Sequence, residues 1–166
     1  LVYNALKVCT HLTMPSPDIA RNLVNKEHKM IVQVCEAFTQ TDGAIEVIMT
    51  LLAEPLSRHP KMSDRDASLV ELVIVFLRNL VASSMPPNGA SFIEMEEGRR
   101  VHSDLLRKFK EAEVMDLLLT IAQHARERPF KSQSSALLEI FLNTFNFTSA
   151  DQLMNIPDVT AATEIP

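Results

Sequence analysis

Prolines divide this chain into apolar blocks of helical length, and this punctuation constrains the fold more than any other feature. Such blocks run from Leu1 to Met14, from Leu69 to Ala82 and from Ala136 to Phe145. Proline cannot donate the hydrogen bond that continues a helix, and it disfavours helix at the residue before it. The blocks are therefore predicted to be separate helices that stack side by side. Stacked-helix proteins usually present surfaces to partners.

The composition favours an all-α domain. Hydrophobic residues make up 46% of the 166 residues, only 3 residues are glycine, and no stretch shows clear strand alternation. The length suits about one domain. The formal net charge is −5, from 16 basic and 21 acidic residues. Because domains dedicated to DNA binding are usually basic, this balance argues against strong autonomous binding of nucleic acid.

Apolar residues recur at helical spacing in seven stretches, each of which predicts a helix. The expected helices lie at about 1–13, 27–39, 44–53, 66–82, 99–112, 114–127 and 132–145. The helix at 66–82 is apolar on almost every side, which predicts a place in the middle of the stack. A buried strand through Val70–Phe76 is the competing interpretation, but the block is too long for one. Loops are expected at 55–63 and 83–98.

A weak internal repeat groups the later helices into two triplets. Phe76-Leu77 in the first triplet matches Phe141-Leu142 in the second, 65 positions later. Three-helix units stacked in this way describe an armadillo- or HEAT-like array, a fragment of a right-handed α-solenoid. We expect the first helix to be the last of a preceding unit, with apolar surface exposed at the cut end. The chain is therefore interpreted as part of a longer protein, with a flexible tail at 155–166.

No catalytic motif or metal-binding spacing is recognisable. The chain has no phosphate-cradling glycine loop, and its five histidines are scattered without an H-x-x-x-H pair. These histidines are His11, His28, His59, His102 and His124. Cys9 and Cys35 lie in apolar helical patterns and are expected to be buried, reduced thiols, which suits the cytosol or nucleus. We therefore expect no enzyme activity, no cofactor, no metal, no small-molecule substrate and no membrane span.

Two polar residues interrupt the most apolar block. In the structural interpretation, Arg78 pairs with an acid or with carbonyl groups, because a buried charge needs a partner. Asn79 would then hold an adjacent loop by hydrogen bonds. In the functional interpretation, Asn79 lies on a concave surface and grips an extended partner chain, as asparagines do in armadillo proteins. The sequence favours the structural interpretation without excluding the other.

The predicted helix at 99–112 carries a basic cluster. Its members are Arg99, Arg100, Arg107, Lys108 and Lys110. One interpretation is a solvated face balanced by neighbouring glutamates. The other is a contact with the DNA backbone, which would depend on salt and ignore base sequence. Arg126, Arg128 and Lys131 form a smaller second cluster.

Six segments carry a family resemblance. They are Leu6–Pro15, Phe76–Val81, His102–Leu106, Val114–Leu119, Leu138–Phe141 and Asp151–Leu153. In order and spacing they resemble the N-terminal helical domain of the Timeless family, over most of residues 1–154. The chain departs from the family pattern at His11, where an asparagine is usual. It also departs at Thr144–Phe147, which replaces the usual Phe-Arg.

The resemblance implies a non-enzymatic nuclear scaffold at replication forks. Such proteins pair with a Tipin-like small subunit, travel with the replicative helicase, stabilise paused forks and pass checkpoint signals through Claspin-like mediators. Insect relatives work instead in the circadian clock, where they bind Period and Cryptochrome. A clock role is therefore one alternative. A generic armadillo-type interaction module, or one with weak DNA backbone contact, is another.

Overall fold

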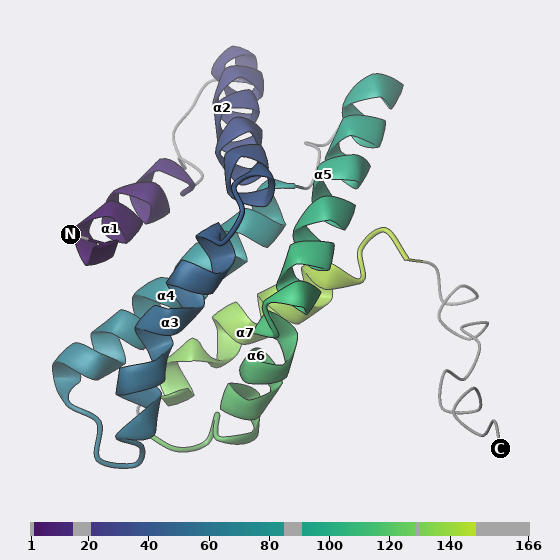
Figure 1. Cartoon of the computed structure of the whole chain (residues 1–166). Coiled ribbons are helices and arrows are strands. Elements are labelled where there is room, and N and C mark those ends of the chain that lie inside the picture. The colour runs from purple at the N-terminus through teal and green to yellow at the C-terminus, as the bar shows by residue number, and fades with distance from the viewer. Residues whose placement is uncertain (1, 15–20, 85–90, 129, 149–166) are drawn as a thin grey trace, which may run out of the picture.

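The computed structural model of the chain is a stack of helices, and it describes residues 2–14, 21–84, 91–128 and 130–148 (Figure 1). The described residues form seven α-helices and a short 3-10 helix, with no strand among them. The elements are α1 (Val2–Leu12), α2 (Arg21–Gln40), α3 (Ala44–Ser57), α4 (Asp64–Ser83), α5 (Phe92–Glu111), α6 (Val114–Gln123), η1 (Phe130–Gln133) and α7 (Ser134–Thr144). The predicted all-α helical stack is confirmed. The expected tail at 155–166 lies outside the described residues.

The start of α5 corrects the expected loop at 83–98. Helix α5 begins at Phe92, so its first two turns occupy part of that loop. Ser91 accepts a hydrogen bond from the Glu94 amide at 3.4 Å, and the Glu94 carboxylate accepts one from the Ser91 amide at 2.9 Å. This reciprocal cap satisfies amides that a helix end leaves unpaired. Residues 92–98 of the expected loop therefore belong to a helix.

Other helix ends also differ from expectation. Helix α2 begins at Arg21 rather than near residue 27, and α3 continues through Pro55 to Ser57. A proline in the last turn breaks only one helical hydrogen bond, so the buried Pro55 shortens the helix less than predicted. Helix α6 ends at Gln123 and not near residue 127, because turns occupy the following residues.

Helix α4 lies in the middle of the stack, as its all-round apolar pattern predicted. It packs against α1, α2, α3 and α7. Its fully buried apolar residues are Val70, Val73, Ile74, Phe76, Leu77, Leu80 and Val81. The Phe76 ring meets the Phe38 ring of α2 edge-on, with 5.0 Å between ring centroids, which is a favoured aromatic geometry. The competing strand interpretation of this block is wrong.

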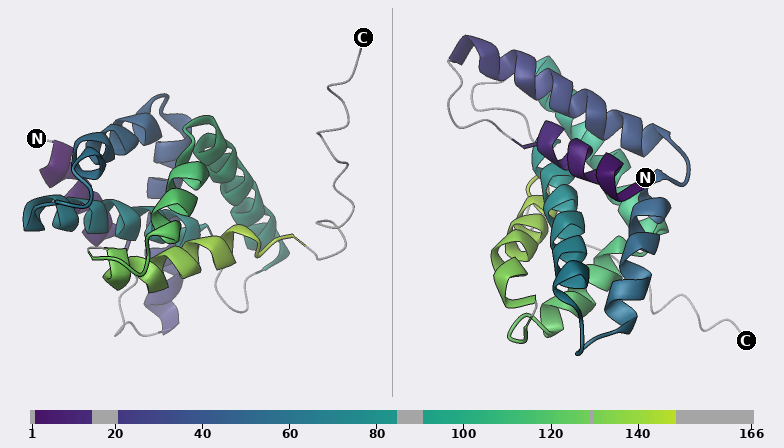
Figure 2. Two further views of the ribbon diagram at one scale, coloured as in Figure 1. Left: turned by 90° about the horizontal axis from the view of Figure 1, so that it is seen from below. Right: turned by 90° about the vertical axis from the view of Figure 1, so that its left-hand side faces the viewer.

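Helices that are three apart in the chain lie next to each other in several places. Helix α4 contacts both α1 and α7, while α2 contacts α5 beside the upper end of the stack (Figures 1 and 2). These contacts join corresponding helices of the predicted triplets. The two leucines that the repeat aligns differ in burial, because Leu77 is buried and Leu142 is 70% exposed. Helix α4 is covered by four neighbouring helices, whereas α7 keeps an outer face. That the helices wind as a right-handed solenoid stays a prediction.

None of the helices in the described ranges combines the length and apolar character needed to cross a membrane.

Replacing Phe76 by alanine should destabilise the chain by about 3–5 kcal/mol, because a buried aromatic ring leaves a cavity that its neighbours fill only in part. The matched control is Phe92→Ala, since the Phe92 side chain is 76% exposed. We expect that control to change the unfolding free energy by no more than about 0.5 kcal/mol. Urea unfolding of both variants checks the prediction. Equal, small losses would show that α4 is not the packed centre.

Candidate functional site

The basic cluster of α5 is largely neutralised by carboxylates. Lys108 Nζ lies 3.0 Å from Asp42 Oδ1, and this hydrogen bond is the main reason that the pKa of Lys108 is raised. Arg107 Nη1 lies 2.8 Å from Glu111 Oε1. Arg107 and Lys108 are therefore held in ion pairs on this face.

The other members of the cluster are also paired, with one exception in the described residues. Arg100 bonds Glu36 of α2, and Arg99 Nε lies 3.7 Å from Glu96 Oε1. Lys110 is exposed and has no ion pair within the described ranges. Because Arg100 and Lys108 reach α2 and the turn after it, these two cations join α5 to its neighbour. Contact between this cluster and DNA stays a prediction.

Arg78 and Asn79 link three helices. Asn79 is 2% exposed, and its Nδ2 donates to the Thr10 carbonyl and the Thr13 hydroxyl, each at 3.3 Å. Arg78 donates to the Asn79 side-chain oxygen at 3.0 Å and lies 3.6 Å from the Glu139 carboxylate. The pair therefore ties the end of α1 and the surface of α7 to α4. These contacts favour the structural interpretation, and partner binding by this pair stays a prediction.

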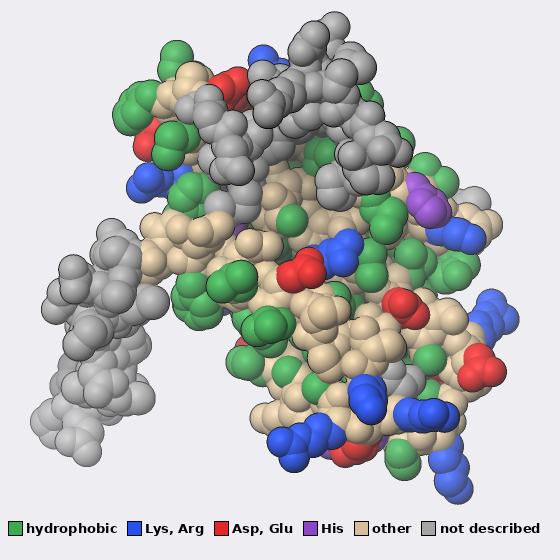
Figure 3. All heavy atoms as spheres, turned by 180° about the vertical axis from the view of Figure 1, so that it is seen from behind, with side chains coloured by type: hydrophobic (Ala, Val, Ile, Leu, Met, Phe, Trp, Pro, Cys, Tyr) green, Lys and Arg blue, Asp and Glu red, His purple; other side chains and the backbone are tan. Residues whose placement is uncertain are grey.

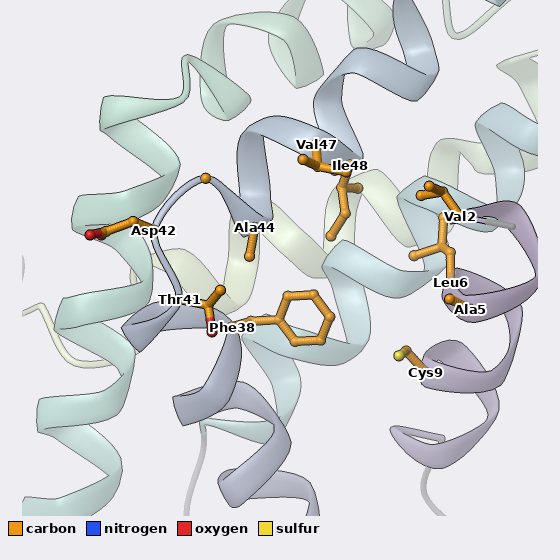
Figure 4. Close-up of a pocket in the computed structure, with 11 residues that line it drawn as sticks. Val2, Ala5, Leu6, Cys9, Phe38, Thr41, Asp42, Ala44, Val47 and Ile48 are labelled. Atoms are coloured by element: carbon orange, nitrogen blue, oxygen red, sulfur yellow. The ribbon is translucent and has the colours of Figure 1, made fainter.

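An apolar pocket of about 300 Å³ opens between α1, the end of α2 and the start of α3 (Figure 4). Its lining includes Leu6 and Cys9 from α1, Phe38 from α2 and Val47 from α3. Asp42, on the turn, points away from the apolar side chains (Figure 4) and instead pairs with Lys108. The pocket has no convergent set of polar groups, so its chemistry suits an apolar side chain rather than a reaction.

Exposed apolar side chains gather on the outer helices. Helix α1 exposes Val2, Tyr3, Val8 and Leu12, and α7 exposes Leu138, Leu142 and Phe145. Four- and three-residue spacing places the α7 side chains on one face of that helix. Figure 3 shows hydrophobic side chains on the face of the molecule that carries α7. These surfaces can supply the apolar anchors that partner binding needs.

The buried Cys35 thiol has low reactivity. Burial raises the pKa of the Cys35 thiol to about 12, with a further contribution from the charge of Glu36. Its Sγ lies 3.6 Å from the Leu80 carbonyl. Since the thiolate is the reactive form, this side chain acts as part of the core. Cys9 is free and only partly buried.

His102 is a buried titratable group between two parts of the stack. Its Nδ1 lies 2.7 Å from the Ser84 hydroxyl, and its Nε2 lies 3.4 Å from the Thr144 carbonyl at the end of α7. Burial lowers the pKa of His102, and the hydrogen bond to Thr144 opposes this in part. His102 therefore joins α5 to the ends of α4 and α7, and the folded state favours its neutral form over its protonated form.

The structure brings together one set of metal-ligating side chains that motif spacing did not reveal. His59, His124 and Glu127 each place a ligand atom within 4.8 Å of the others. They come from two connections rather than one helix, so no short motif could reveal them. One signal was present in the sequence, because the two histidines stand 65 positions apart, which is the offset of the internal repeat.

These features define a stacked-helix protein with ion-paired and apolar surfaces. Residues 1–164 match the family model described as Timeless protein. The chain therefore belongs to the Timeless family, and the resemblance inferred from its motifs is confirmed.

A curated relative is Topoisomerase 1-associated factor 1 of Coccidioides immitis (strain RS). It is 30% identical over 112 residues, which cover 68% of this chain and 9% of the relative. The chain thus corresponds to a small part of that protein. No solved structure matches the chain.

Acidification should weaken the fold through His102. A lowered pKa in the folded state means that the unfolded chain binds more protons once the pH falls below the ordinary histidine value of 6.5. The unfolding free energy should therefore fall as the pH drops below about 6.5, by at most about 1.4 kcal/mol per pH unit for this proton, until the pH reaches the lower pKa of the folded state. In the variant His102→Gln, the unfolding free energy measured with urea should depend less steeply on pH, because this proton is no longer bound.

The matched control for this pH dependence is His11→Gln, because His11 is exposed on α1. It should keep the wild-type slope. A slope that is the same in wild type and His102→Gln would contradict the role assigned to His102.

Proposed function

We propose that this chain is part of a non-enzymatic nuclear scaffold of the replication fork protection complex. The observation that supports the proposal is the Timeless family match, which runs through nearly the whole chain. The relative's name, Topoisomerase 1-associated factor 1, describes a protein associated with topoisomerase 1. Support of paused forks and of the replication and DNA-damage checkpoint is the role that we assign to the full protein.

The proposed mechanism is passive. A rigid helical stack holds a Tipin-like subunit, the replicative helicase and a Claspin-like mediator in register. A few apolar and arginine anchors supply most of the energy in protein interfaces. The exposed α7 face of Leu138, Leu142 and Phe145 offers such apolar anchors. Helix α4 beneath it supplies the rigidity, because its buried side chains pack against α7.

The alternatives differ in partner rather than in fold. A circadian-clock protein that binds Period and Cryptochrome would use the same kind of scaffold. Direct contact with DNA through α5 requires that phosphate compete with carboxylates already paired to Arg107 and Lys108. The fork scaffold is preferred because the relative's name concerns a topoisomerase and not the clock.

Affinity capture of the full-length parent protein from nuclear extract tests the proposal. Wild type should recover a Tipin-like subunit and helicase components, and deletion of residues 1–154 should lose at least one of them. The double variant Leu138→Glu, Leu142→Glu should reduce recovery of the partners about tenfold or more. Each change places a charge in the interface where an apolar anchor is proposed. Quantitative mass spectrometry of the captured proteins measures the change.

The matched control is Leu119→Glu, an exposed leucine on α6. It should leave recovery unchanged, and thermal melting of each parent variant shows whether the fold is intact. Recovery of Period or Cryptochrome instead would move the protein to the clock branch. Recovery of neither group would overturn the scaffold proposal. Full recovery by the α7 double variant would place the anchors elsewhere.

A further inference from the structure

Three side chains meet where the α3–α4 connection passes the α6–η1 turn. His59 belongs to the first connection, His124 is the C-terminal cap residue of α6, and Glu127 lies in the turn that follows. Glu127 Oε1 lies 3.1 Å from His124 Nδ1, and Glu127 Oε2 lies 3.3 Å from His59 Nε2. One carboxylate thus faces two imidazole nitrogens at once.

These distances suit a tetrahedral zinc site. Zinc binds histidine nitrogen and carboxylate oxygen at about 2.0–2.2 Å, so neighbouring ligands of a tetrahedron lie about 3.3 Å apart. Each histidine nitrogen lies near this spacing from one oxygen of the Glu127 carboxylate, His124 Nδ1 from Oε1 and His59 Nε2 from Oε2. The three ligand atoms all lie within 4.8 Å of one another, so side-chain adjustment would bring the two histidines to a common metal ion.

The His59 ring has an unused nitrogen. Its Nε2 is shielded from solvent and makes no hydrogen bond to any described residue. Glu127 lies within ion-pair distance, but the approach does not meet hydrogen-bond geometry. The Phe130 ring stacks on the His59 imidazole, with 5.3 Å between ring centroids, and helps to hold the orientation of the imidazole. A buried polar nitrogen without a partner is costly, and a metal ion would satisfy it.

The backbone around the cluster is already fixed. The His59 amide donates to the Leu56 carbonyl at 3.0 Å, and the Glu127 amide donates to the His124 carbonyl at 2.9 Å. The Lys131 amide in turn donates to the Glu127 carbonyl at 3.0 Å. Metal sites bind more tightly when their ligands need little ordering. These turns therefore leave the backbone at His59 and Glu127 with little conformational freedom to lose.

The charge of the cluster also suits a divalent cation. Two neutral imidazoles and one carboxylate carry a net charge of about −1 when they bind metal. Arg126 and Arg128 flank Glu127 but are exposed. Exposed charges are screened by salt over about 8 Å, so the ligand atoms dominate.

We propose that His59, His124 and Glu127 form a zinc site that clips the α3–α4 connection to the turn after α6. Three protein ligands leave the fourth position to water or to a ligand from a partner. The site joins one end of the first helix triplet to the same end of the second. It therefore stabilises the register of the stack, and it does not depend on the fork-scaffold role proposed above.

Metal titration of the full 166-residue chain tests the site. After removal of metal with a chelator, the chain should bind one equivalent of Zn²⁺ in calorimetry, with a rise in melting temperature. Co²⁺ should give the visible absorption of a four-coordinate nitrogen and oxygen site. The single variants His59→Gln, His124→Gln and Glu127→Gln should each weaken Zn²⁺ binding by more than the roughly 10–100-fold that loss of an outer-shell partner costs.

The matched control is His11→Gln, which removes an exposed histidine far from these connections in sequence. It should bind Zn²⁺ as wild type does. Circular dichroism of each metal-free variant shows whether it is folded, and Glu127→Gln keeps the size of the side chain if a histidine variant fails to fold. Absence of a stoichiometric site in the wild-type chain would overturn the proposal. Equal binding by wild type and Glu127→Gln would do so as well.

Discussion

Burial of α4 on nearly all its sides is the constraint on which the rest of the structure depends. An apolar helix of this kind is stable in water only when other helices cover it. Helices α1, α2, α3 and α7 provide that cover. The positions of the surfaces follow from this arrangement, because α1 and α7 each give one face to α4 and keep the other exposed. Partner surfaces on such a stack are therefore outer faces of helices held by a shared core.

Polar side chains connect the helices of this core. Asn79 bonds two groups at the end of α1, and Lys108 pairs with the turn that follows α2. A buried amide that loses its partners costs about 1–3 kcal/mol, so such contacts select one register among many apolar packings. The proposed zinc site would act in the same way at the far end of the triplets.

The sequence predicted the features that depend on long apolar patterns. The central place of α4 followed from its all-round apolar surface, and the family followed from the order of several short motifs. Features set by local capping were missed, since the pairing of Ser91 with Glu94 turns an apparently acidic loop into two helical turns. The predicted basic cluster proved largely ion-paired, because its partners Glu36 and Asp42 lie far away in the sequence. His59, His124 and Glu127 escaped detection for the same reason.

Amide hydrogen exchange of the full chain, followed residue by residue, tests the central claim most directly. Core elements exchange only when the whole protein opens, whereas outer elements exchange through local fluctuations. The amides of α4 around Phe76 and Leu77 should be the slowest in the chain, and their exchange should report the global unfolding free energy. The amides in the last turns of α1 and α7 should exchange faster. Exchange of α4 at the rate of α7 would contradict a stack built around α4.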